Sequence, residues 1–335
     1  MAQVLGLTIL SFFITGILFI PFIDFLYKIK LRRQEQTTKD VFNHRTPLFD
    51  KFHKWKVGTP FGGGILIVLV VSILTLWAYG LLQVDVNPWE IFVILFSFIS
   101  FGLLGLYDDI KKLSKQESAF FGLRLRQKFI IQWVLAFIIA AVLYTKLGYS
   151  FIFVHGFGLA SLGIVYILFA AFIIVSFVNA FNITDGLDGL AGGLFLICLV
   201  AFLAITSREL EQGLGIFVAV LMGSVAAFLY FNIYKARIWL GDVGSLSLGA
   251  ALAVIGLLTG KIITLAVIGG VFIFEVGSSL IQISSKKILG RKILPVSPLH
   301  LYLQKIGWEE PKIVMRAWLL GFFLAVLGLY IAFIH

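Results

Sequence analysis

Long runs of apolar residues, broken by short polar connections, fill almost the whole of this sequence. A run of about 17–25 apolar residues is long enough to cross the hydrocarbon core of a bilayer as a helix. That length predicts ten membrane-spanning helices, near residues 4–27, 61–82, 90–107, 129–147, 161–180, 189–206, 213–231, 245–259, 262–283 and 316–334. The predicted fold class is therefore an all-α polytopic membrane protein, with residues 1–335 forming a single integral-membrane domain.

Basic residues are distributed very unevenly among the connections between these helices. One alternate set of connections holds 24 of the 27 Lys and Arg residues, and the other set holds only Lys146, Arg208 and Lys261. Because cytoplasmic connections are the ones enriched in Lys and Arg, the pattern predicts both termini outside and the long polar connections on the cytoplasmic face. The net charge of +10 then belongs to a surface that attracts anionic lipids and phosphorylated ligands, and nucleic acid is not expected.

Composition and cysteine usage agree with a membrane protein. The chain is 60% hydrophobic and only 13% charged, which is outside the range of ordinary soluble domains. Its single cysteine, Cys198, lies in an apolar run, so a disulfide framework and a cysteine-based metal site are excluded. Positive charge follows the first apolar run rather than preceding it, which favours a first transmembrane helix over a cleaved signal peptide.

Acidic residues recur at the predicted cytoplasmic ends of helices. A charge near hydrocarbon costs about 2.5–3.5 kcal/mol on insertion scales, so such residues usually pair, line a wet cavity or hold an ion. Asp108 and Asp109 lie where the third predicted helix leaves the membrane, and Asp185 and Asp188 lie in the stretch NAFNITDGLDGL between two apolar runs. In that stretch we expect Asn182 to cap the following helix, with the two acids on one face of its first turn.

Further candidates lie near the last predicted helices. Glycines flank Asp242 at a helix start, where backbone amides favour phosphate, and Trp239 just before it offers a flat face to a nucleobase. Asn232 offers an amide for hydrogen bonding, and His300 lies in a long connection at 284–316. Taken alone, each motif is also typical of a structural role, such as a solvated helix end, a capping acid or a packed histidine.

Basic partners for these acids come from His53, Lys56 and the segment at 124–128, which contains Lys128. Metal ions and fixed cations neutralise the charge that develops on phosphate oxygens during phosphoryl transfer. Magnesium takes oxygen ligands and keeps waters, which suits aspartates and asparagines. The residues together predict magnesium-assisted phosphoryl transfer at the membrane surface, with one substrate from the cytosol and the other from the lipid.

Several motifs, taken together, resemble a known family. They are the His53-x-x-Lys56-x-Gly58-Thr59-Pro60 entry to the second predicted helix, the Asp108-Asp109 pair, Lys128-Phe129, NAFNITDGLDGL, Phe231-Asn232, GDVGSLSLGA from Gly241, and the Glu310-Pro311-Lys312 segment. On these motifs the chain is similar, over nearly its whole length, to the polyprenyl-phosphate N-acetylhexosamine-1-phosphate transferases. Within that family it most resembles the members that use UDP-N-acetylmuramoyl-pentapeptide.

The resemblance implies a fold, a reaction and a location. The family has ten transmembrane helices with both termini outside and an active site on the cytoplasmic face. The implied reaction transfers phospho-N-acetylmuramoyl-pentapeptide from its UDP donor to undecaprenyl phosphate, releases UMP and yields the first lipid-linked peptidoglycan precursor. The implied cofactor is Mg²⁺, and the implied location is the bacterial inner membrane, where such an enzyme serves cell-wall synthesis, cell shape and cell division.

The resemblance also implies roles for individual residues. The catalytic set would be Asp108, Asp109, Asp242 and His300, and the magnesium ligands would be Asp242, Asp108, Asp109 and Asp188. The substrate-binding set would be Lys56, Thr59, Lys128, Asn179, Asn182, Asp185, Asp188, Asn232, Trp239, Ser245 and Gln282. Trp239 would stack on uracil. Asp108 is the family's usual candidate for a base, although a phosphate monoester is already largely ionised near neutral pH, so the need for a base is small.

Departures from the family pattern keep two alternatives open. Members with the muramoyl donor usually carry three consecutive histidines where this chain has His300-Leu301-Tyr302, so a related transferase using UDP-N-acetylglucosamine remains an alternative. An ion-coupled transporter is the second, but transporters place acids near the bilayer midplane. Here only Glu275 lies inside a predicted helix, and we expect it to pair across helices or to hold the last connection. A homodimer is compatible with the sequence.

Overall fold

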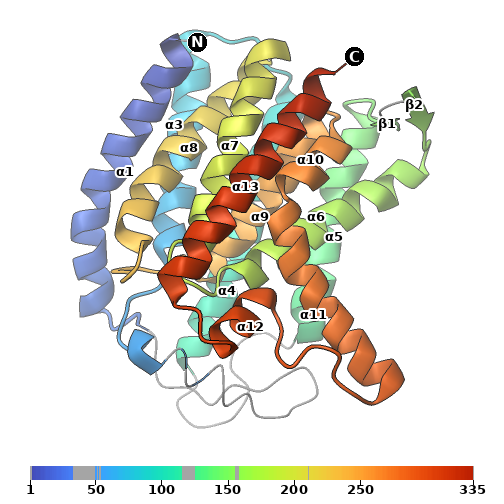
Figure 1. Ribbon diagram of the computed structural model, residues 1–335. Coiled ribbons are helices and arrows are strands. Elements are labelled where there is room, and N and C mark those ends of the chain that lie inside the picture. Colours follow the sequence, from blue (N-terminus) through green and yellow to red (C-terminus); the bar gives the residue numbers. More distant parts are fainter. Residues whose placement is uncertain are drawn as a thin grey trace.

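The computed structural model describes residues 2–32, 50, 52, 54–114, 125–154, 158–209 and 211–334. Within these ranges, nine helices are long and apolar enough to cross a membrane, and a sharply bent pair of helices brings the number to ten if it counts as one span. Both ends of the chain lie at the upper end of the bundle in Figure 1. The helical, polytopic character predicted from the apolar runs is confirmed.

The long helices pack side by side as a bundle (Figure 1). In chain order they are α1 (Ala2–Lys28), the 3-10 helix η1 (Lys54–Lys56), α3 (Gly63–Leu82), α4 (Pro88–Ser114), α5 (Leu125–Thr145), β1 (Phe151–Val154), β2 (Gly158–Ser161), α6 (Val165–Thr184), α7 (Leu190–Glu209), α8 (Gln212–Asn232), α9 (Gly241–Leu258), α10 (Ile262–Ile268), α11 (Gly270–Leu289), α12 (Leu299–Lys305) and α13 (Glu310–Phe333).

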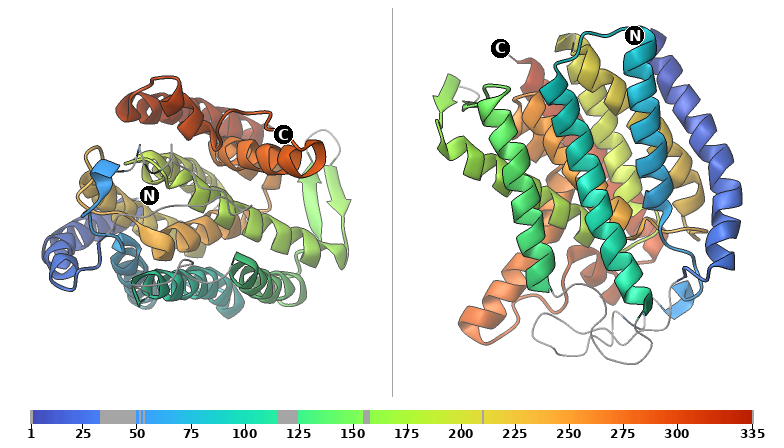
Figure 2. Two further views of the ribbon diagram at one scale, coloured as in Figure 1. Left: turned by 90° about the horizontal axis from the view of Figure 1, so that it is seen from below. Right: turned by 180° about the vertical axis from the view of Figure 1, so that it is seen from behind.

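Helix α9 forms the centre of the bundle and is almost entirely buried, whereas α1 lies at the periphery and is mostly exposed (Figure 2). Small residues let its neighbours approach closely, as is common between membrane helices. A Cβ atom at Gly64 of α3 would stand 2.1 Å from the backbone nitrogen of Gly244, and one at Gly105 of α4 would stand 2.2 Å from the carbonyl oxygen of Asp242. Backbone contacts on both sides therefore hold the first turn of α9 in place.

The ninth predicted span, 262–283, is not one continuous helix. It breaks into α10 and α11, which are bent by 77° relative to each other. The break falls at Gly269, where a Cβ atom would stand 2.6 Å from the Phe177 ring; a glycine pair at 269 and 270 is a common cause of such a kink. The lower part of α11 consequently leaves the bundle, as Figures 1 and 2 show.

Two helix boundaries near the acidic motifs differ from the prediction. Helix α4 continues to Ser114, so Asp108 and Asp109 lie within it rather than beyond its end. Helix α6 ends at Thr184 and α7 begins at Leu190, which leaves the segment 185–189 as a connection that we call the DGLDG loop. The prediction that its acids share the first turn of a helix is wrong, because Gly189 adopts a positive φ of 78° there.

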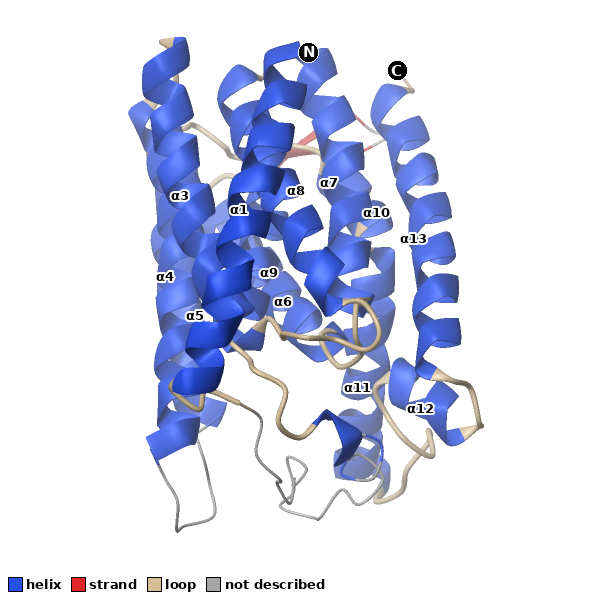
Figure 3. Ribbon diagram, turned by 90° about the vertical axis from the view of Figure 1, so that its left-hand side faces the viewer, coloured by secondary structure: helices blue, strands red, loops and turns tan. Residues whose placement is uncertain are grey.

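The connections add structure that the apolar pattern did not predict. Strands β1 and β2 form an antiparallel hairpin between α5 and α6. The short helix α12 lies in the long connection between α11 and α13, at the lower end of the bundle (Figure 3). That lower end lies away from the chain termini (Figure 3).

Candidate functional site

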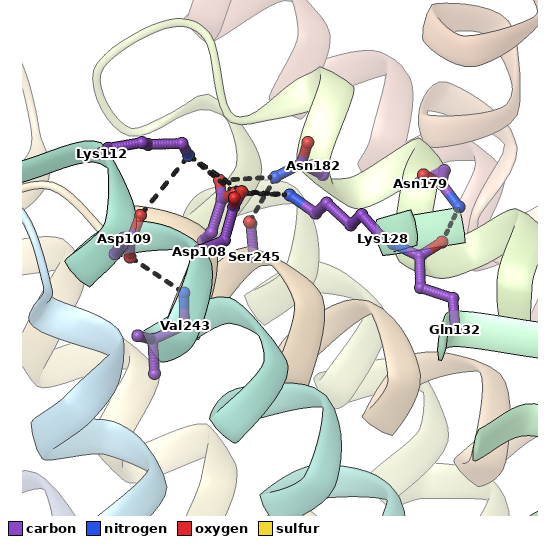
Figure 4. A network of polar contacts seen from close by, with 10 residues as sticks. Asp108, Asp109, Lys112, Lys128, Gln132, Asn179, Asn182, Val243 and Ser245 are labelled. Atoms are coloured by element: carbon purple, nitrogen blue, oxygen red, sulfur yellow. Dashed lines mark hydrogen bonds and ion pairs between the residues drawn. The ribbon is translucent and has the colours of Figure 1, made fainter. Parts of the chain in front are cut away.

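Three carboxylates and two lysines form a cluster at the lower ends of α4, α5 and α9 (Figure 4). The Nζ atom of Lys128 lies 2.5 Å from Asp242 Oδ2 and 3.0 Å from Asp108 Oδ2. The Nζ atom of Lys112 lies 2.8 Å from Asp242 Oδ2, 3.3 Å from Asp108 Oδ2 and 3.6 Å from Asp109 Oδ1. The two ammonium groups therefore bridge acids from different helices, and three carboxylates against two cations leave an excess of negative charge.

Asp242 is the centre of this cluster. Its second oxygen, Oδ1, accepts a hydrogen bond of 3.2 Å from the side-chain amide of Asn182. The same amide donates to the hydroxyl of Ser245, one turn further along α9, at 2.7 Å. Asn182 lies in the last turn of α6, and α7 begins only at Leu190, so the prediction that Asn182 caps α7 is wrong. Its side chain binds residues of α9 instead. The structure thus brings three predicted site residues together (Figure 4).

The side chain of Asp109, which belongs to α4, binds at the start of α9. Its Oδ2 atom accepts a hydrogen bond of 3.3 Å from the backbone nitrogen of Val243, in the first turn of that helix. A negative group is favourable there, because unpaired amides and the helix dipole give a helix start a partial positive charge. The amide that sequence reasoning offered to a phosphate is thus occupied by a carboxylate of the protein.

A second cluster ties the DGLDG loop to the rest of the molecule. Lys56 Nζ lies 3.0 Å from Asp188 Oδ1 and 2.5 Å from Glu310 Oε1, and all three side chains are buried. Glu310 also accepts a hydrogen bond of 2.6 Å from the backbone nitrogen of Asp188, and the backbone nitrogen of Ala236 donates to Asp188 Oδ2 at 2.9 Å. Both oxygens of Asp188 therefore have partners within the protein.

Two other predicted binding residues lie beside this second cluster. The Lys56 ammonium sits over the ring of Trp239, 4.5 Å from its centroid, so one face of the predicted uracil platform meets a cation. Asn232 bonds with backbone at both ends: its Oδ1 accepts from Gly189 at 3.1 Å and its Nδ2 donates to the Ile238 carbonyl at 2.9 Å. In this arrangement Asn232 shapes the DGLDG loop rather than presenting its amide to a ligand.

His300 on α12 is buried against the other side of the DGLDG loop. Its Nδ1 lies 3.0 Å from Oε2 of Glu275 on α11. A Cβ atom at Gly186 would stand 2.5 Å from His300 Nε2, so the ring packs edge-on against the loop backbone. The expectation that Glu275 pairs across helices, or holds the last connection, is confirmed by this contact.

Two of the remaining predicted residues, Gln282 and Asn179, bond with residues outside both clusters. Gln282 bonds with the backbone of Leu294, donating at 2.6 Å and accepting at 3.0 Å, so its amide fixes the connection after α11. Asn179 donates to the Gln132 side chain at 2.7 Å, between α6 and α5. Thr59 follows η1 and is partly buried. His53, with Arg124 from the predicted basic segment, lies outside the described residues.

The electrostatics of the DGLDG loop depend on the neighbouring acids. Burial raises the pKa of Asp185 to about 7, and the negative charge of Asp242 contributes in the same direction, while Lys56 opposes it. Desolvation disfavours a charged carboxyl group, and a nearby like charge adds to that effect. Near neutral pH, Asp185 is therefore poised between its two protonation states, which makes the loop sensitive to any cation that approaches.

The donor atoms suit a hard divalent cation. Asp108 and Asp242 direct one oxygen each at a common point, which Lys128 Nζ occupies, and magnesium prefers carboxylate oxygens together with water. Within the described residues, no three His, Cys, Asp or Glu side chains are already arranged to hold a metal. The carboxylate oxygens thus suit magnesium, which would take the position between Asp108 and Asp242 that Lys128 Nζ now occupies.

Sequence reasoning missed the part that Lys112 and Glu310 play in these clusters. Lys112 is absent from the site residues predicted from the sequence, although it is spaced i+4 from Asp108 and i+3 from Asp109, which places all three on one helix face. Glu310 stood only in a family motif. Its contact with Lys56 spans 254 positions, and no local pattern carries such a signal.

Comparisons with known proteins agree along the whole chain. The family model described as glycosyl transferase family 4 matches residues 91–260. A protein of Geobacillus sp. (strain WCH70) is 38% identical over 328 residues, which cover 96% of each chain. Proteins of Bacillus pumilus (strain SAFR-032) and Bacillus subtilis (strain 168) are 36% and 35% identical over 331 residues, covering 98% of each chain. All three relatives are named phospho-N-acetylmuramoyl-pentapeptide-transferase.

Proposed function

The chain belongs to glycosyl transferase family 4, among the phospho-N-acetylmuramoyl-pentapeptide-transferases, and we propose that it carries out the reaction that this name describes. The substrates are UDP-N-acetylmuramoyl-pentapeptide and undecaprenyl phosphate. The products are UMP and the first lipid-linked precursor of peptidoglycan. The observation that carries this proposal is similarity over 96–98% of both chains, which includes every element that forms the two clusters.

The reaction exchanges one phosphoanhydride bond for another, while the sugar keeps its phosphate ester. An oxygen of undecaprenyl phosphate attacks the phosphorus that carries the sugar, and the bond from that phosphorus to the bridging oxygen breaks. The bridging oxygen and its electron pair leave with UMP. The attacking phosphate is already largely ionised near neutral pH, so no base is required, and positioning with charge neutralisation supplies most of the catalysis.

Lys112 and Lys128 are the residues best placed to neutralise the phosphates. Each already contacts two or more carboxylates, and a lysine ammonium, as a point charge on a flexible stem, can exchange a carboxylate for a phosphate oxygen. We infer that lipid and donor phosphates meet at this cluster. The transfer of positive charge from carboxylate to phosphate oxygens stabilises the transition state, in which charge spreads over those oxygens.

We propose that magnesium binds at the same cluster. Asp242, Asp108 and Asp109 would hold it, and it would supply a further positive charge against the phosphate oxygens. The excess negative charge of the cluster supports this proposal. Asp188 is a weaker candidate ligand than the sequence suggested, since its oxygens face Lys56 and the Ala236 amide.

We assign the DGLDG loop to the donor. The negative charge of Asp242 contributes to the raised pKa of Asp185, so the loop lies within electrostatic reach of the first cluster. A sugar bound along the loop would then have its pyrophosphate near Lys112 and Lys128. Trp239 is the candidate for stacking on uracil, and Lys56, which already lies over that ring, would contact the nucleotide. This division leaves Asp108, Asp109 and Asp242 for metal and phosphate, and Asp185 and Asp188 for shaping the donor site.

We place the site on the cytoplasmic face of a bacterial inner membrane, with both termini outside. The distribution of 24 of 27 Lys and Arg residues over one set of connections supports this orientation. Members of both clusters lie at helix ends that border those connections: Lys112 near the end of α4, Lys128 near the start of α5, Lys56 in η1 and Glu310 at the start of α13. A nucleotide-linked donor made in the cytosol then reaches the site directly, and the lipid phosphate enters from the bilayer.

The experiment that tests this function offers purified protein undecaprenyl phosphate with either UDP-N-acetylmuramoyl-pentapeptide or UDP-N-acetylglucosamine. We expect UMP release and a lipid-linked product with the first donor only. Product with UDP-N-acetylglucosamine alone would instead establish the related transferase, which the single histidine at position 300 keeps as the second candidate. Turnover with neither donor would contradict the transferase assignment.

A further inference from the structure

We propose that Glu275 is a positioning residue: it orients the His300 imidazole against the DGLDG loop, and this pair sets the affinity for the UDP-sugar donor. The inference rests on the proposed function, because it concerns the donor site of that reaction. It assigns a role to a buried acid of α11 that the phosphate chemistry leaves unused.

Glu275 directs one oxygen at His300 twice. Its Oε2 atom lies 3.0 Å from His300 Nδ1 and also accepts a hydrogen bond of 3.4 Å from the His300 backbone nitrogen. Glu275 is only 4% exposed and His300 only 1%. A carboxylate that binds both the ring and the backbone of one residue fixes the position of the ring as well as its rotation.

The fixed ring meets the loop at a point where no side chain fits. Since Nδ1 faces Glu275, the opposite nitrogen, Nε2, faces Gly186, where a Cβ atom would stand only 2.5 Å away. Gly186 lies between Asp185 and Asp188, the two acids assigned to the donor. A displaced imidazole would therefore alter the path of the loop between them.

The burial of the Glu275 carboxylate indicates that it has a specific role. An acid inside an apolar membrane helix is costly unless it is paired, and α11 around Glu275 is otherwise built of apolar and small residues. A purely structural link between α11 and α12 could use apolar packing at lower cost. The acid instead contacts the imidazole of His300, which approaches the loop.

The contacts also indicate which substrate is affected. The Glu275–His300 pair joins α11 and α12 to the DGLDG loop, whereas the lysine–aspartate cluster is built from α4, α5 and α9. Loss of the pair should therefore weaken binding of the donor and leave the affinity for undecaprenyl phosphate nearly unchanged. A general loss of structure would affect both substrates.

The test is a double-mutant cycle on the full-length protein, with Glu275→Gln, His300→Ala and the double variant. We expect each single variant to raise the KM for the donor by roughly tenfold to a hundredfold, the range for a lost charge-assisted hydrogen bond. The double variant should be no worse than His300→Ala. Losses that multiply would overturn the proposal, as would an equal rise in the KM for undecaprenyl phosphate.

Two further variants cover loss of folding and a purely steric effect. Glu275→Met removes the acceptor but keeps the volume, so it should match His300→Ala, whereas Glu275→Gln keeps an acceptor oxygen and should retain part of the affinity. Ser278→Ala removes a hydrogen bond from the same turn of α11 without touching His300, and it should behave as wild type. An inactive wild type would contradict the proposed function itself, whereas an active wild type with an additive cycle would contradict only this inference.

Discussion

Asp242 joins three polar side chains of the lysine–aspartate cluster, since Lys112, Lys128 and Asn182 all bind its two oxygens. Removing its charge therefore affects every other member. The two lysines would keep only Asp108 and Asp109 as partners, and their orientation toward a phosphate would be lost.

We expect Asp242→Asn and Asp108→Asn to insert normally and to lose UMP release by about two orders of magnitude or more, comparable to the loss of a group that stabilises transition-state charge. The measurement is UMP release by purified protein at saturating substrates. Ser247→Ala is the matched control, because that hydroxyl donates to the Gly244 carbonyl within its own helix. Turnover at the wild-type rate in either Asp variant would refute the site assignment.

Removal of divalent cations should abolish turnover and magnesium should restore it, because the cluster carries excess negative charge that two lysines do not cancel. Activity is measured after treatment with a chelator and during titration with magnesium. Asp109→Asn should require more magnesium for half-maximal activity than wild type does. Full activity in the presence of the chelator would contradict a magnesium site.

Several site residues were predictable because their chemistry is unusual for their surroundings. Acids next to apolar runs, such as Asp108, Asp185 and Asp242, stand out in the sequence on grounds of cost alone. The partners of these acids do not stand out in the sequence. Lys56 meets Glu310 across 254 positions, and the roles of Asn232 and Gln282 in holding backbone depend on how the loops fold, which no spacing in the sequence encodes.

At the scale of elements, the position of α9 depends on glycines in its neighbours. Gly64 and Gly105 let α3 and α4 contact the backbone of its first turn, where Asp242 lies. In a membrane, where helices gain little from hydrophobic association, such close packing is a main source of stability.

Gly64→Ala should destabilise the protein by about 1–3 kcal/mol or more, as expected for overpacking, because the new methyl group would meet the backbone of Gly244 rather than a flexible side chain. The check is the melting temperature of the purified protein in detergent. Gly80→Ala, on the same helix, has open space around its Cβ position and should not lower the melting temperature. Equal effects of the two changes would show that the close approach is unimportant.

The link between α13 and the DGLDG loop gives a second prediction for the elements. Glu310→Gln should lower stability by roughly 1.5–3 kcal/mol, since charged hydrogen bonds from Lys56 and the Asp188 amide are weakened. The readout is again the melting temperature. Glu309→Gln makes the same change at an exposed neighbour and should have little effect; if it destabilises equally, the buried contacts do not explain the loss.

Helix number was predictable from apolar length, while helix ends and breaks were not. The run at 262–283 is apolar enough for one span, yet packing of Phe177 against Gly269 accompanies a bend of 77°. Helix α4 runs beyond its apolar segment to Ser114. Ion pairs of Lys112 with Asp108 and Asp109 support the helix there, and Lys112 also pairs with Asp242 of α9.

At the scale of the whole molecule, 24 of the 27 Lys and Arg residues lie in one alternate set of connections, which we place on the cytoplasmic side. A variant with Lys146→Cys should react with a membrane-impermeant maleimide in intact cells, and one with Lys292→Cys should react only after permeabilisation, because we place these exposed positions on opposite sides. The native Cys198 is buried and should give little background. The opposite labelling pattern would reverse the proposed orientation.

The contact of Glu310 with Lys56 and Asp188 also has a consequence for the order of events during synthesis. Glu310 begins α13, so it leaves the ribosome after every other residue of the two clusters. Until then Lys56 and the DGLDG loop lack one of their buried partners. The site is completed only when α13 docks, so insertion of the earlier helices alone does not yield an active enzyme.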